Sequence, residues 1–100
     1  MNEKVKLHGG LEKTVTWVWL EEGALKVEYY DFSEAAQDAF GNDIAYILTV
    51  NDMKKFYKQA ECDESSIIQL ISGKFSSYFD IKRWLEAYEI DFEKQIDHWA

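Results

Sequence analysis

The residues most able to do chemistry in this chain are a single thiol and two imidazoles. Cys62 is the only cysteine, and His8 and His98 are the only histidines. An imidazole beside a thiol can activate it as a nucleophile, so Cys62 and His98 would form a catalytic pair if the fold brought them together. The alternative is that Cys62 lies in a connection between two helices and is inert. We favour the inert thiol, because isolated Cys–His pairs arise by chance in most chains.

Metal and phosphate chemistry are not expected either. A structural zinc site needs about four Cys or His ligands at short spacings, which this chain lacks. The segment Ser72-Gly73-Lys74 is similar to part of a phosphate loop, but the upstream glycine of GxxxxGK is missing, so the segment is more typical of a helix end. We therefore expect no catalytic residue, no metal and no cofactor, and the sequence predicts a protein that is not an enzyme.

Carboxylates are the abundant ionisable groups, and they are unevenly spread. The chain has 19 acidic and 11 basic residues, with a formal net charge of −8. Between Glu21 and Asp52, eight carboxylates accompany one base, Lys26, so this segment carries −7 of the net charge. Paired carboxylates can perform acid–base catalysis. Nothing sets one pair apart, however, and solvated surface charge is the ordinary state of such groups.

Concentrated negative charge steers partners of opposite sign, so the acidic segment predicts a basic protein partner. Nucleic acid is not expected as a partner, because phosphate contacts need clustered Lys and Arg, and Arg83 is the only arginine. The predicted partner-binding residues are seven of these acids and one tyrosine: Glu21, Glu22, Glu28, Tyr30, Asp31, Glu34, Asp38 and Asp43.

Length and composition predict one globular domain over residues 1–100. Hydrophobic residues make up 47% of the chain and aromatics 16%, which is typical of a packed core and not of a disordered acidic tail. Neither a signal-peptide core nor an apolar run of roughly 20 residues is present, so no membrane association is expected. A single cysteine fits a reducing cytosol. We expect a cytoplasmic protein that is a monomer or a weak homodimer.

Residues 14–31 predict a β-hairpin, because two runs of β-branched and aromatic residues flank a turn with Gly23. A two-residue type I′ loop would put Glu22 at positive φ, which is unfavourable for Glu, so we expect a three-residue loop, Glu21-Glu22-Gly23. In that register the core face carries Val15, Trp17, Trp19, Leu25, Val27 and Tyr29. The other face, half apolar with acids at its rim, would be a protein-binding patch of Thr14, Thr16, Val18, Leu20, Lys26, Glu28 and Tyr30.

The rest of the chain predicts a third strand and about four helices. The first helix would run from Ser33 through about Phe40, and alternation from Asp43 to Val50 predicts the strand. Asn51 is expected to cap a second helix over residues 52–60, Asp63 a third, and a capping box of Ser77 and Asp80 the fourth. Residues 90–100 fit either a helix or an extended segment, and we favour an extended segment beside the sheet. The fold class is therefore α+β, an antiparallel sheet of three or more strands covered on one face by helices.

Three runs of residues carry a resemblance to a protein family. They are Val27-Glu28-Tyr29-Tyr30-Asp31-Phe32, then Gly41-Asn42-Asp43-Ile44-Ala45-Tyr46 with Leu48-Thr49-Val50, and Ile81-Lys82-Arg83-Trp84-Leu85-Glu86 through Trp99. In them the chain resembles small acidic bacterial immunity proteins of polymorphic toxin and contact-dependent growth inhibition systems. The resemblance implies a cytosolic inhibitor that binds a toxin domain, often a basic nuclease. It does not assign a functional role to any particular residue of this chain.

Two functional hypotheses from different classes follow. The first is a non-enzymatic immunity protein that uses the acids between Glu21 and Asp52 to neutralise a basic toxin domain. The second is a small regulatory or adaptor domain that self-associates or docks onto a cytosolic enzyme through the mixed sheet face. Raised salt should slow association in the first case and not in the second.

Overall fold

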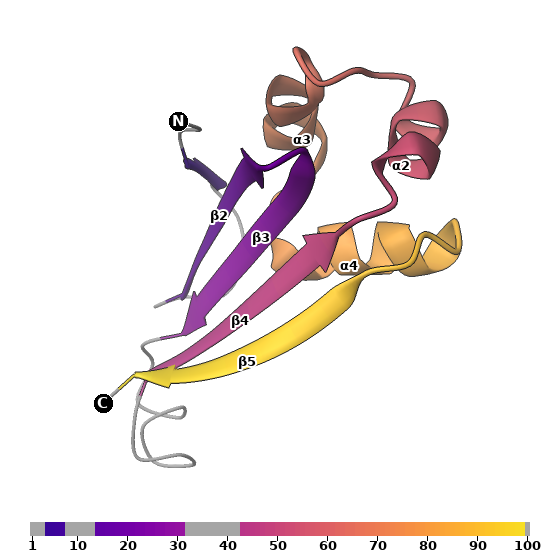
Figure 1. Cartoon of the computed structure of the whole chain (residues 1–100). Helices are drawn as coiled ribbons and strands as arrows, with labels where there is room; N and C mark the ends of the chain where they lie inside the picture. The colour runs from indigo at the N-terminus through magenta and orange to yellow at the C-terminus, as the bar shows by residue number, and fades with distance from the viewer. Residues whose placement is uncertain (1–3, 8–13, 32–42, 100) are drawn as a thin grey trace.

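The computed structural model describes residues 4–7, 14–31 and 43–99, which form an antiparallel sheet with helices on one side (Figure 1). Five strands lie in the order β1-β2-β3-β4-β5, and α2, α3 and α4 connect β4 to β5. The strands are β1 (Val5–Leu7), β2 (Thr14–Glu21), β3 (Ala24–Asp31), β4 (Asp43–Val50) and β5 (Glu93–Trp99), and the helices are α2 (Met53–Ala60), α3 (Ile67–Lys74) and α4 (Tyr78–Ala87).

The α+β class and the antiparallel sheet confirm the sequence prediction, and so does the third strand from Asp43 to Val50. Residues 93–99 form the extended segment that we favoured, and they pair with β4 along its length. Of the four expected helices, three lie in the described part of the chain. The helix expected from Ser33 through about Phe40 lies outside the described residues.

The hairpin between β2 and β3 forms, but the predicted three-residue loop is wrong. Glu21 pairs with Ala24, which leaves a two-residue turn with φ of 52° at Glu22 and 82° at Gly23. Positive φ at both central residues is the type I′ turn whose twist matches that of the flanking strands. Glu22 therefore adopts the conformation that the sequence argument rejected as unfavourable for Glu.

This turn inverts the predicted facing of β2. Thr16, Val18 and Leu20 lie on the helix-covered face and are buried, whereas Trp17 and Trp19 lie on the opposite face. The strain at Glu22, roughly 1–2 kcal/mol, is offset because this register buries Val18 and Leu20 beside Leu25. The loss of one residue from the loop is enough to exchange the two faces of a strand.

The helices begin close to the predicted positions, with different caps. Asp52, and not Asn51, caps α2 by accepting the backbone N–H of Lys55 at 3.4 Å. Asp63 was expected to cap α3, but the residue at the start of the helix is Ser66, which makes no side-chain cap bond. Asp63 instead accepts the N–H groups of Ser65 and Ser66 in the turn before α3. The hydroxyls of Ser65 and Ser66, followed by these N–H groups, hold the pKa of its carboxyl below the usual value.

The predicted capping box of Ser77 and Asp80 does not form. Ser77 makes no side-chain cap bond at the start of α4, and the carboxylate of Asp80 accepts from the N–H of Ser76 at 3.1 Å. The N–H of Tyr78 instead donates to Oγ1 of Thr16 at 3.0 Å. A residue 62 positions away thus satisfies one of the unpaired donors of this helix start, which no local motif predicts.

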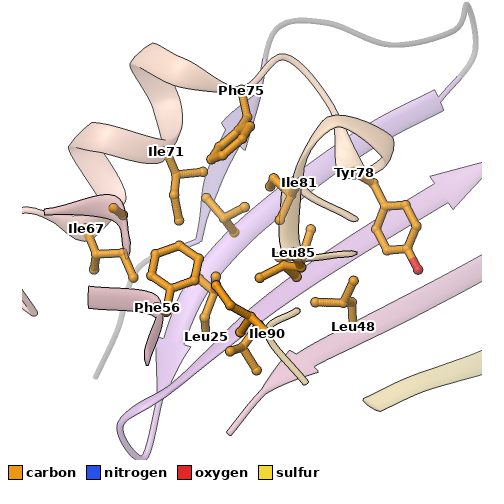
Figure 2. Packing of buried hydrophobic residues seen from close by; sticks show 14 of the residues in the cluster. Leu25, Leu48, Phe56, Ile67, Ile71, Phe75, Tyr78, Ile81, Leu85 and Ile90 are labelled. Atoms are coloured by element: carbon orange, nitrogen blue, oxygen red, sulfur yellow. The ribbon is translucent and has the colours of Figure 1, made fainter. Parts of the chain in front are cut away.

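The core lies between the helices and the sheet. Figure 2 shows Phe56, Ile67, Ile71, Ile81 and Leu85 from the helices packed over Leu25 and Leu48 of the sheet, with Ile90 closing the cluster. Trp84 packs edge-on to Phe56 at 5.1 Å between ring centroids and lies against the core cluster, so this tryptophan has a structural role.

Candidate functional site

One face of the sheet carries none of the three described helices, and we call it the open face (Figure 1). Strand alternation and the pairing register assign its members. Those whose side chains the structure describes on β2, β3 and β4 are Val15, Trp17, Trp19, Glu21, Ala24, Lys26, Glu28, Tyr30, Ala45, Ile47 and Thr49. The open face contains Glu21, Glu28 and Tyr30, three of the eight predicted partner-binding residues, with Glu21 at its end beside the turn.

Glu28 occupies the middle of the open face. The register places it directly between Trp17 on β2 and Ile47 on β4, and all three side chains are partly exposed. Directly opposed residues in an antiparallel pair have Cβ atoms about 4.5–5.5 Å apart, so the carboxylate is flanked on both sides by apolar surface. In the described part of the chain, Glu28 makes no side-chain hydrogen bond or ion pair. It is available to a cation from a partner.

Three lysines, Lys4, Lys6 and Lys26, lie on the same face, and Lys6 of β1 is exposed directly opposite Trp17. Lys4 lies over the ring of Trp19, with its ammonium 4.3 Å from the ring centroid, and Trp19 is buried. Lys26 donates to the hydroxyl of Thr49 at 3.0 Å. Lys4 and Lys26 are thus engaged with neighbours on their own sheet, and none of the three described lysines forms an ion pair with Glu28.

Apart from Glu28, the predicted acids that the structure describes divide between the two ends of the sheet. Glu21 and Glu22 are exposed at the β2–β3 turn, while Asp31 ends β3 and Asp43 begins β4 at the other end. The rise along β3 separates these ends by roughly 23 Å. The acids that are close in sequence do not form a single compact cluster, because an eight-residue strand carries the chain from one end to the other.

Asp31 differs from Glu28 in the face that it occupies. The hydroxyl of Tyr29 donates to Oδ2 of Asp31 at 3.4 Å on the helix-covered side of the sheet. Burial, followed by the negative charge of Asp31, raises the pKa of Tyr29 to about 12. Asp31 thus contacts a tyrosine of the core and does not share the surface of Glu28. Glu34 and Asp38 lie outside the described residues.

The thiol and the imidazole considered above are far apart. Cys62 follows α2, whereas His98 lies near the end of β5, where it pairs with Ile44, and these two regions lie at opposite ends of the molecule (Figure 1). Burial, together with the nearby carboxylate of Asp63, raises the pKa of the Cys62 thiol. A raised pKa disfavours the thiolate, so this cysteine is a poor nucleophile.

Comparisons of the chain with protein-family models, curated proteins and solved structures found no match. Among the residues that the structure describes, no three or more His, Cys, Asp or Glu side chains are grouped so as to hold a metal ion. None of the described helices has the length and apolar character needed to cross a membrane.

Sequence reasoning missed Trp17 and Ile47 as members of the candidate site. Trp17 was expected in the core because the loop was taken to have three residues, so the error at Glu22 displaced it to the wrong face. The signal for the correct assignment was Gly23 at the second position of a two-residue loop, a position that type I′ turns reserve for glycine.

Proposed function

We propose that this chain is a non-enzymatic protein-binding domain whose open face docks onto a basic partner. The observation that carries the proposal is the position of Glu28, a partly exposed carboxylate without a described partner, between Trp17 and Ile47. Tryptophan is enriched at the energetic centres of protein interfaces. A carboxylate flanked by apolar side chains suits an arginine or lysine that becomes desolvated on binding.

The charge of the whole chain favours the same partner. A net charge of −8 attracts a basic protein over long range and raises its rate of association. The acids at the two ends of the sheet, including Glu21 and Glu22, would contribute to this attraction away from Trp17 and Ile47 at the centre of the interface. Apolar contact at Trp17 and Ile47 would then slow dissociation.

The most concrete form of the proposal is a cytosolic immunity protein that binds and neutralises a basic, nuclease-like toxin domain. It is supported by the acidic charge and by the resemblance carried by residues 27–32, 41–50 and 81–99. Inhibition by occlusion would need no catalytic group on this chain.

A pull-down from lysate of the organism that makes this protein tests the proposal. The tagged chain is compared with Trp17→Ser on the open face and with Tyr88→Ser, a control at an exposed aromatic of the helical side. We expect a basic protein that the wild type and Tyr88→Ser retain, that Trp17→Ser loses, and whose recovery falls as salt is raised. Recovery of the same proteins by all three chains would contradict the use of the open face.

A second candidate function, a self-associating adaptor, is favoured by β5. Among the described strands, β5 lies at the edge of the sheet, and its residue Ile96 is 50% exposed. An edge strand offers unpaired backbone groups to a second copy or to another protein. Sedimentation of the purified chain over a range of concentrations separates the candidates. A mass that rises to a dimer in the wild type and not in Ile96→Lys would favour the adaptor.

A further inference from the structure

A hollow on the helix-covered side of the sheet is separate from the open face. It has a volume of about 260 Å³ and lies between α4 and the strands β4 and β5, lined by Tyr46, Tyr78, Phe79, Lys82, Lys94 and Ile96. Tyr46 of β4 is more than 30 positions from the lining residues of α4 and β5 in the sequence, and the packing of α4 on the sheet brings them together.

Aromatic rings form one wall of this hollow. Tyr46 stacks on Tyr78 with 6.2 Å between centroids and on Tyr29 with 5.6 Å. Phe79 packs edge-on to Tyr29 at 5.0 Å and remains 38% exposed. Rings held by one another in this way form a firm apolar wall against which a flat group can stack.

A buried hydroxyl in the wall lacks a partner. Tyr78 is 2% exposed, and its hydroxyl makes no hydrogen bond with the described residues. Figure 2 shows the hydroxyl at the margin of the core cluster, at the far end of the ring from the helix. An unsatisfied buried hydroxyl costs free energy, and this cost is removed when a ligand supplies the missing hydrogen-bond acceptor or donor.

Two lysines determine the charge of the ligand that the hollow favours. Lys82 and Lys94 both line it, and Lys94 forms no ion pair with any described residue. Lys82 contacts Glu86 at 3.3 Å in an exposed i,i+4 pair, the kind that contributes little and exchanges readily. Two ammonium groups at an aromatic site exclude a cationic ligand and favour an anionic one.

From the aromatic wall, the unpartnered hydroxyl and the two lysines, we propose that this hollow binds a small aromatic carboxylate. The ring would stack against Tyr46 and Phe79, the carboxylate would lie at Lys94 and Lys82, and the hydroxyl of Tyr78 would hydrogen-bond to the ligand. The volume is slightly below the roughly 300 Å³ at which pockets for drug-sized ligands begin, so the occupant is expected to carry a single ring.

The test uses 3-phenylpropanoate as the probe, titrated into the isotopically labelled full chain and followed by nuclear magnetic resonance. We expect saturable shifts at the backbone amides of Tyr46, Phe79 and Ile96. The neutral alcohol 3-phenylpropan-1-ol has the same ring without the charge, and propanoate has the charge without the ring. Both should bind more weakly than the probe.

Matched lysine variants test whether the positive charge that binds the probe is the charge of the lysines in the hollow. Lys94→Gln should weaken binding of the probe about three- to fivefold, as expected for loss of one exposed ion pair. Lys58→Gln, which removes an exposed lysine of α2, should leave the dissociation constant unchanged. Tyr78→Phe should also weaken binding, because it removes the hydroxyl and keeps the ring.

Three results would overturn the proposal. The first is a titration without saturation or with shifts confined to other residues. The second is equal affinity for the carboxylate and the alcohol, which would indicate apolar adsorption. The third is equal weakening by Lys94→Gln and Lys58→Gln, which would indicate attraction to the chain as a whole.

Discussion

The side-chain hydroxyl of Thr16 in β2 accepts a hydrogen bond at 3.0 Å from the backbone N–H of Tyr78, the first residue of α4. Both residues are buried, with exposed fractions of 2%. This bond links the start of the last helix to the second strand of the sheet. It forms only because the two-residue turn at Glu22 and Gly23 directs Thr16 towards the helices.

Replacement of Thr16 by valine should therefore destabilise the fold. Thr16→Val keeps the shape of the side chain and leaves the N–H of Tyr78 buried without a partner, which should lower the free energy of unfolding by about 1–2 kcal/mol. Urea denaturation measures the loss. Thr16→Ser is the matched control, because it keeps the hydroxyl and removes a methyl group. A Thr16→Val protein more stable than Thr16→Ser would show that the bond contributes little.

Because the backbone at Glu22 is strained, a substitution at this position should stabilise the protein. Asn tolerates positive φ and precedes glycine in the most favoured type I′ turns, so Glu22→Asn should raise the free energy of unfolding by about 0.5–1 kcal/mol. Glu21→Asn removes the same charge at a residue whose φ is not positive, and it should have a smaller effect. Equal stabilisation by both substitutions would attribute the gain to reduced charge repulsion.

Thr16 and Glu22 also show how much of the fold could be predicted from the sequence. The hairpin, the strand from Asp43 to Val50, the three described helices and the α+β class were predicted from local periodicity and turn residues, whereas the short strand β1 was not predicted. Which face of β2 packs on the core was not predicted, because it depends on a balance between backbone strain at Glu22 and burial of Val18 and Leu20. Single-residue propensity describes only the backbone strain. The bond from Tyr78 to Thr16 is a long-range contact that no local pattern encodes.

The candidate site was predicted in part for the same reason. Glu28 and Tyr30 were assigned to the non-core face of β3, and they lie on the open face. Glu21, Glu22 and Asp31 are close in sequence but lie at the ends of a strand, since distance in an extended segment grows with each residue. The hollow beside α4 was not predicted, because its lining combines α4 with two strands and depends on packing.

Alkaline pH should destabilise the protein through its two buried tyrosines. Burial is the largest cause that raises the pKa of both Tyr29 and Tyr78 from 10.0 to about 12. The folded state holds these protons more tightly, so their contribution to stability is complete below pH 10 and is lost as the pH rises from about 10 to 12. Denaturant unfolding measured at intervals from pH 8 to 12 should show this decline. Tyr78→Phe should reduce its slope, and an unchanged slope would contradict the assignment.

At neutral pH the same substitution has a different expected result. Tyr78→Phe removes a buried hydroxyl that lacks a hydrogen-bond partner among the described residues. The free energy of unfolding should therefore stay the same or rise by up to about 1 kcal/mol. Thermal and urea unfolding at pH 7 measure the change. A clear loss of stability would mean that the hydroxyl has a partner in the folded protein.

A matched pair of charge reversals tests whether Glu28 on the open face contacts a basic partner. Glu28→Lys and Glu64→Lys change the net charge equally, but Glu64 is exposed in the turn before α3, on the helical side. The measurement is the dissociation constant of each variant for the partner recovered by the wild type. We expect a loss of affinity of about tenfold or more for Glu28→Lys and little change for Glu64→Lys. Equal losses would show that only the overall charge matters, and would contradict the open face as the binding site.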